Sequence, residues 1–398
     1  MMTNGLLVGY LLKPIGLVFW RQIIWLAGLL ILYILILKNA EEKYRYNGIR
    51  KYMKITNTLI CVFSFIALFI SDYSLIRILF SDIQYVFSFS FLAMPYFFTD
   101  ERNRKRLFRY FTLLGIFISV GLIIDSMSPV FESFKVKANA EERTTFFTEH
   151  ATTMGLFYNF LLIALCYYAY YTKSALMSFF LILSSLLFIP GAWVTGSRQV
   201  LLIIMLTLAC FYLYVFIKKA KMRLWIGLVF FVVSVFFYNS IITFMNNSNQ
   251  SSRFEMNMIE DDVRYLRWIE GVRYFSINYV NYWLFGHGIG TTNDAQVTSD
   301  EYQLSHYENT YIARFIDTGY MGLFIFLFPV FYIIRLLLKN RFTLFSLLMY
   351  SFVTGYLIIS FISPNGAHPL STSTLFIVIG LLLHRDKFDI DFKGALKL

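Results

Sequence analysis

Two side chains suited to proton transfer lie at the end of the longest polar stretch in the chain, residues 246–310. His306 and Glu308 are two residues apart, directly before a long apolar run. Either side chain could act as a general base toward a sugar hydroxyl. The alternative is a structural role, in which Asn309 or Thr310 caps the following helix and His306 is a surface residue.

Three arginines occupy the middle of the same stretch. Arg264, Arg267 and Arg273 surround Trp268, and if this part is helical, Arg264 and Trp268 share a face. Guanidinium groups bind phosphate through two parallel hydrogen bonds, so the cluster is suited to an electropositive phosphate site with aromatic rings for sugars. The alternative is an amphipathic helix lying on a membrane surface.

A fourth arginine stands in the turn Thr195-Gly-Ser-Arg198, which immediately precedes an apolar run. Gly196 permits a tight turn, and the start of the next helix offers unpaired amides and a positive dipole. Arg198 would then complete an anion site. The alternative is an arginine that extends to the membrane surface as an anchor.

Motifs for nucleotides, metals and redox chemistry are weak or absent in the sequence. The turn Phe285-Gly-His-Gly-Ile-Gly290 lacks the strand and helix of a dinucleotide fold, so it predicts a tight backbone bend near the membrane. Asp261-Asp262 is a poor metal motif. The three cysteines, Cys61, Cys166 and Cys210, lie inside apolar runs without metal-ligand spacing. We therefore expect no cofactor and no metal.

The elements that must position these residues are membrane helices. Of 398 residues, 58% are hydrophobic and only 15% are charged, and the mean hydropathy is +0.61. These values lie outside the range of soluble domains and predict an all-α polytopic membrane protein. The net charge of +11 lies mainly in short loops, as expected for membrane orientation rather than nucleic-acid binding.

The apolar runs predict eleven spanning helices within a single membrane domain, residues 1–398. The predicted spans are residues 22–37, 55–70, 75–98, 107–124, 151–171, 175–194, 200–217, 224–244, 311–337, 343–362 and 371–383. Residues 5–20 form a twelfth candidate, interrupted by Lys13-Pro14. The stretch 246–310 is then a large loop outside the lipid, with short helices of its own.

Threading the eleven spans places every basic loop on one side of the membrane. These loops are residues 38–54, 99–109, 218–223, 339–341 and the tail from residue 384. The positive-inside rule makes that side, including the C-terminus, cytoplasmic. The candidate site would then lie on the extracytoplasmic face, because 195–198 and 246–310 fall on the opposite side. Eleven spans place the N-terminus outside, and twelve would place it inside.

Four motifs in this order resemble the superfamily of O-antigen polymerases and O-antigen ligases. They are Thr195-Gly-Ser-Arg198, Arg264 with Trp268, the segment 284–290, and Glu308-Asn-Thr-Tyr-Ile312 followed by Gly319 and Gly322. The resemblance covers about residues 190–325. It implies a GT-C-like glycosyltransferase architecture, metal-independent transfer with inversion, and a polyprenyl-diphosphate donor. It also implies Arg198 and Arg264 as diphosphate contacts, with Arg267 and Arg273 as further candidates.

One residue departs from the family pattern. Ligases of the family carry a histidine at the position of Glu308, where it is proposed as the base. This chain offers Glu308 or His306 as the catalytic base, which favours a polymerase over a ligase.

The resulting hypothesis is a polysaccharide repeat-unit polymerase of the bacterial inner membrane. It would act on undecaprenyl-diphosphate-linked glycan in the synthesis of O-antigen (lipopolysaccharide), capsule or exopolysaccharide. Besides this substrate and membrane lipids, the resemblance implies a chain-length regulator as a partner. The position of the basic residues in short loops predicts no nucleic-acid partner. The alternatives are an O-antigen ligase and, from another class, a flippase or transporter of lipid-linked glycan, which would need charged residues inside the spans.

Overall fold

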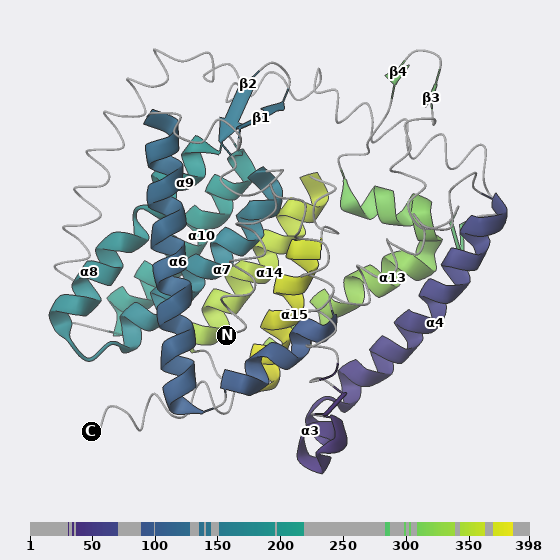
Figure 1. The fold of residues 1–398 in the computed structure, drawn as a ribbon, viewed down its shortest axis with the longest axis horizontal. Coiled ribbons are helices and arrows are strands. Elements are labelled where there is room, and N and C mark those ends of the chain that lie inside the picture. Colours follow the sequence, from purple (N-terminus) through teal and green to yellow (C-terminus); the bar gives the residue numbers. More distant parts are fainter. Residues whose placement is uncertain are drawn as a thin grey trace.

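The computed structural model (Figure 1) describes a set of segments that includes most of the predicted spans. The described residues are 31, 34–35, 37–70, 89–98, 100–127, 135–138, 141–144, 151–195, 197–218, 283–286, 298–299, 302–303, 309–338, 343–362 and 369–384.

The described chain is dominated by helices, with two short hairpins between them (Figure 1). The helices are α3 (Ala40–Arg45), α4 (Asn47–Ile70), the 3₁₀ helix η2 (Phe89–Phe98), α6 (Glu101–Met127), α7 (Ala151–Tyr171), α8 (Ala175–Ser185), α9 (Phe188–Val194), α10 (Arg198–Lys218), α13 (Thr310–Leu338), α14 (Leu344–Ile362) and α15 (Pro369–Leu383). The hairpins pair β1 (Lys135–Ala138) with β2 (Glu141–Thr144) and β3 (Thr298–Ser299) with β4 (Tyr302–Gln303).

Within the described residues, five helical segments are long and apolar enough to cross a membrane. They are Arg102–Ile124, Ala175–Val194, Gln199–Lys218, Thr310–Leu338 and Leu344–Phe361, and two shorter apolar helices are Gly155–Tyr171 and Thr372–Leu383. Large apolar side chains such as Leu213, Phe324 and Phe331 are exposed on these helices, as lipid-facing residues are. The prediction of a helical multi-pass membrane protein is confirmed at this level.

The helix boundaries follow the predicted spans with informative exceptions. The helix α4 begins at Asn47, well before the apolar run, so its first turns carry the basic residues of the predicted loop. The span predicted at 175–194 is interrupted at Leu186–Leu187, between α8 and α9. Pro190 explains this break, because proline has no amide proton and its ring clashes with the carbonyl four residues earlier.

Several predictions fall on residues outside the described segments. The spans predicted at 5–20 and 224–244 lie there entirely, and those at 22–37 and 75–98 lie there in large part. The described end of the last of these is η2, whose Pro95 cannot donate an α-helical hydrogen bond.

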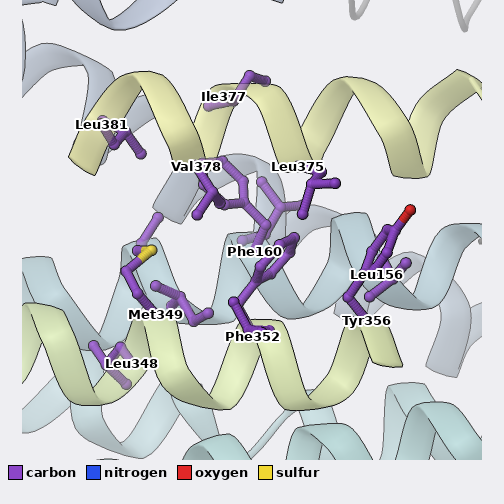
Figure 2. Packing of buried hydrophobic residues seen from close by; sticks show 14 of the residues in the cluster. Leu156, Phe160, Leu348, Met349, Phe352, Tyr356, Leu375, Ile377, Val378 and Leu381 are labelled. Carbon is purple, nitrogen blue, oxygen red and sulfur yellow. The ribbon is translucent and has the colours of Figure 1, made fainter. Parts of the chain in front are cut away.

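The core of the bundle lies where α7, α14 and α15 meet. Figure 2 shows Phe160 of α7 between Phe352 of α14 and Leu375 and Val378 of α15, and all four side chains are buried. Small residues allow helices to approach closely. At Gly355 of α14, an added Cβ would come within 2.7 Å of Ile203 Cγ2 on α10, so no larger residue fits without movement.

Polar side chains also connect three helices inside the bundle. The Thr207 hydroxyl of α10 lies 2.8 Å from Asn159 Oδ1 of α7 and 3.1 Å from Ser351 Oγ of α14. All three residues are buried among apolar side chains. Such hydrogen bonds contribute only modestly to membrane-protein stability, because the polar groups of separated helices also find hydrogen-bond partners in the membrane.

Aromatic contacts show which helix ends lie together. Phe108 near the start of α6 packs on Tyr167 near the end of α7, and Tyr167 also contacts Phe345 at the start of α14. Tyr170 contacts Tyr214 near the end of α10. We call this the basic end, because the first turns of α6 are rich in Lys and Arg and α10 ends at Lys218.

The opposite end, which we call the hairpin end, contains the starts of α7, α10 and α13 and the end of α14. Both hairpins lie beyond it (Figure 1). The first turns of α6 and the end of α10 therefore lie at the opposite end of the bundle from the two hairpins. The two hairpins add strands that the hydropathy pattern does not predict.

Candidate functional site

Parts of three of the four sequence motifs lie at the hairpin end. They are the residues that lead into α10, the residues that begin α13, and the turn Trp283–Gly286 that contacts α13. The fourth, Arg264 with Trp268, lies outside the described residues.

The first motif forms the predicted turn into a helix. The Thr195 hydroxyl donates to the Ala192 carbonyl at 2.7 Å and accepts from the Ser197 amide at 3.3 Å. The Ser197 carbonyl accepts the first helical hydrogen bond, from Leu201 N at 3.1 Å, so α10 begins at Arg198. The amides of this first turn and the helix dipole favour an anion at this position. The Arg198 side chain lies outside the described part.

The last motif begins α13 with an asparagine cap. Asn309 Oδ1 accepts hydrogen bonds from Tyr311 N at 2.9 Å and Ile312 N at 3.1 Å. Asn309 is also buried, and its carbonyl accepts from Ala313 N at 3.0 Å. The structural interpretation is therefore confirmed for Asn309, which satisfies two amides that the helix itself leaves unpaired.

Helix α14 brings these two helix starts together. The Tyr311 hydroxyl, in the first turn of α13, donates to the Leu357 carbonyl of α14 at 3.2 Å. Two residues away, Gly355 lies against Ile203 in the second turn of α10. The two motifs are more than a hundred residues apart in sequence. In the fold, they flank the same turn of one helix.

The glycine-rich motif contributes the turn Trp283–Gly286, and its tight bend is confirmed at Gly286, where φ is +70°. The turn contacts α13 through its backbone. Tyr320 N donates to Trp283 O at 2.8 Å, and Met321 N donates to Leu284 O at 3.3 Å. The helix is interrupted there by Gly319, with φ 61° and ψ −162°.

A buried acidic residue beside this contact escaped the sequence interpretation. Asp317 is only 4% exposed, one helical turn after the half-buried Arg314. Ionisable residues inside membrane helices are costly and commonly functional. The signal was present in the sequence, because Asp317 is the single acidic residue in the apolar run 311–337.

His306, Glu308, Arg264, Arg267 and Arg273 all lie outside the described residues. Within the described segments, no group of three His, Cys, Asp or Glu side chains could hold a metal ion. The three cysteines are free, with Cys166 buried in α7 and Cys61 exposed on α4.

No protein-family model matches the chain, and a comparison with curated proteins found no match.

Proposed function

We propose that the protein is a polysaccharide repeat-unit polymerase. It transfers glycan from undecaprenyl diphosphate onto a lipid-linked acceptor repeat unit, in the synthesis of O-antigen, capsule or exopolysaccharide. The proposal rests on the ordered motifs, with their resemblance to O-antigen polymerases and ligases, in a chain of apolar membrane helices.

The observation that best supports this function is the meeting of two motifs on α14. The start of α10, which carries Arg198, and the start of α13, which directly follows Glu308 and Asn309, flank Gly355 and Leu357. A transferase of this kind needs a cationic group for the leaving diphosphate and a base for the acceptor within one site. The convergence supplies a common support for both.

In the proposed reaction, an acceptor sugar hydroxyl attacks the anomeric carbon of the donor. A new C–O bond forms while the bond between the anomeric carbon and the diphosphate oxygen breaks. The bonding electrons leave with undecaprenyl diphosphate, and the hydroxyl proton passes to Glu308 or His306 and then to solvent. The donor is already activated, so the reaction balances without a nucleotide.

The arginines act on the charge that grows during this step. Negative charge increases on the diphosphate as the glycosidic bond breaks, so fixed cations stabilise the transition state more than the bound donor. Arg198 begins α10, and in the proposal its positive charge and the dipole of this helix act together on the diphosphate. Arg264, Arg267 and Arg273 supply further contacts in the proposal.

We also propose a location, which the positions of the basic residues support. Basic residues orient membrane proteins with their basic loops in the cytoplasm. We therefore assign the basic end and the C-terminus to the cytoplasm, and the hairpin end to the extracytoplasmic side of the bacterial inner membrane. Translocated lipid-linked repeat units are the substrate there, and a chain-length regulator is the proposed protein partner.

Deletion of the gene followed by sizing of the surface glycan tests the function. A polymerase predicts single repeat units attached to the acceptor. Long polymer that stays on undecaprenyl diphosphate would indicate a ligase instead. Repeat units that remain on the cytoplasmic face would indicate a transporter, and either of these results would overturn the proposal.

A further inference from the structure

The turn Trp283–Gly286 fastens the middle of the polar stretch 246–310 to a membrane helix. Tyr320 N and Met321 N of α13 donate to the Trp283 and Leu284 carbonyls. The Trp283 and Tyr320 rings also meet edge to face, with centroids 6.2 Å apart. The stretch is therefore attached to α13 at this point as well as at Asn309, where it ends and the helix begins. We call this contact the glycine joint, formed by Trp283–Gly286 and Asp317–Met321.

The break in α13 and the turn depend on each other. In a continuous helix, the Tyr320 and Met321 amides would bond to the carbonyls of Ile316 and Asp317, four residues earlier. Gly319 interrupts that pattern, and the turn supplies two carbonyls instead. The hydrogen bonds that the break removes are thus replaced from a segment distant in sequence.

Glycine is required on both sides of the joint. Gly319 has φ 61° and ψ −162°, a region of backbone conformation that is essentially restricted to glycine. A Cβ on Gly319 would lie 2.5 Å from the Trp283 carbonyl oxygen, and a Cβ on Gly286 would lie 2.5 Å from the Asp317 carbonyl carbon. These are backbone atoms that cannot rotate away, so no residue with a Cβ fits at either position unless the two segments move apart.

The joint divides the polar stretch into two parts. The arginines Arg264, Arg267 and Arg273 precede it, and His306 and Glu308 follow it. The second part starts at the joint and ends at Asn309, and nine helical residues at 1.5 Å each separate these points by about 14 Å along α13. Both parts thus share one fixed attachment to the membrane helices.

We infer that the glycine joint positions the diphosphate-binding and proton-accepting parts of the proposed site relative to each other, with Gly286 and Gly319 as its positioning residues. This inference rests on the proposed function. Neither glycine has a side chain that could touch substrate, so each acts through the segments it holds. Misplacement of reacting groups by about 1 Å costs about 100-fold in rate.

Substitution of the two glycines tests the inference with purified protein and lipid-linked repeat units. Gly319→Ala and Gly286→Ala each lower kcat by about 100-fold, because both force the joint apart. KM for the lipid-linked donor changes by less than about 5-fold, since neither substitution removes a side chain that could touch the donor. Gly48→Ala is the control, because its Cβ meets only the end of a side chain, the Tyr332 hydroxyl at 3.1 Å. Normal kcat in both joint variants would overturn the inference.

A cross-link tests the joint without relying on the folding of the glycine variants. Trp283→Cys with Tyr320→Cys, in a chain whose three native cysteines are serine, forms a disulfide because the two backbones are hydrogen-bonded neighbours. We expect the oxidised protein to keep its polymerase activity. Oxidised protein that is inactive and recovers on reduction would overturn the inference, because the joint would then have to open during turnover. Absence of the cross-link would overturn it as well.

Failure of the proposed function has a different signature. Cross-linking is scored on a gel without substrate, so it reports on the joint alone. If the cross-link forms while wild-type protein elongates no glycan, the proposed function fails, and the positioning role fails with it. If wild type elongates glycan and the glycine variants match it, only the positioning role fails.

Discussion

The Tyr311 hydroxyl donates a 3.2 Å hydrogen bond to the Leu357 carbonyl, joining the first turn of α13 to the last turns of α14. Gly355, two residues before Leu357, packs against Ile203 of α10. A single turn of α14 therefore supports the helix starts that follow two sequence motifs. This arrangement is the structural basis for a site at the hairpin end.

Removal of the Tyr311 hydroxyl should loosen this support. We expect Tyr311→Phe to lower the free energy of unfolding by about 1 kcal/mol, the typical net contribution of one hydrogen bond. Glycan elongation should fall by a few-fold, because the start of α13 loses one contact with α14. Thermal unfolding in detergent and elongation assays measure the two effects. Tyr110→Phe is the control, since Tyr110 is 55% exposed on α6; equal effects of both substitutions would contradict the role of Tyr311.

The cap of α13 gives a second prediction. Asn309→Ala leaves the Tyr311 and Ile312 amides without their acceptor, and we expect a loss of about 1 kcal/mol in stability. Asn309→Asp keeps an acceptor oxygen at the cap and should retain most of the stability. The comparison of unfolding temperatures checks this. An alanine variant as stable as the aspartate variant would show that the cap contributes little.

The polar contact inside the bundle predicts energetic coupling between helices. Thr207→Val keeps the shape of the side chain but removes the hydroxyl that links Asn159 and Ser351. We expect a destabilisation of about 1 kcal/mol, within the range measured for hydrogen bonds in membrane proteins. A double-mutant cycle with Asn159→Leu should show coupling, because the residues are in contact. Strictly additive effects would mean that the contact does not contribute.

Among the described residues, the sequence predicted the five membrane-spanning helices, because lipid excludes unpaired polar groups and long apolar runs therefore mark the spans. The start of α10 at Arg198 and the cap at Asn309 could also be predicted from the sequence, since both depend on local residue types. The break at Gly319 was not predicted. It requires a partner segment more than thirty residues away, and local patterns carry no record of that contact. The contacts of α10 and α13 with the same turn of α14 could not be predicted either, because they also join segments that are distant in sequence.

Asp317 shows a signal that was present but passed over. Asp317 is buried at the glycine joint. It lies three residues after Arg314, on the same face of the part of α13 that precedes Gly319. We expect Asp317→Asn, which keeps the size but removes the charge, to lower elongation at least about 10-fold with normal protein levels. Asp317→Glu should recover part of the activity. Elongation assays in membranes, normalised to the amount of protein, measure both variants. Full activity of the asparagine variant would show that the charge has no role.

The most direct test of the polymerase proposal compares two cationic residues at opposite ends of α10. Purified protein in liposomes is given undecaprenyl-diphosphate-linked repeat units, and chain growth is measured by gel. Arg198→Ala should slow elongation by at least about 100-fold, as loss of a transition-state contact does. Lys218→Ala, at the basic end of the same helix, should leave elongation unchanged. Elongation by Arg198→Ala at the wild-type rate, in stably folded protein, would contradict the account.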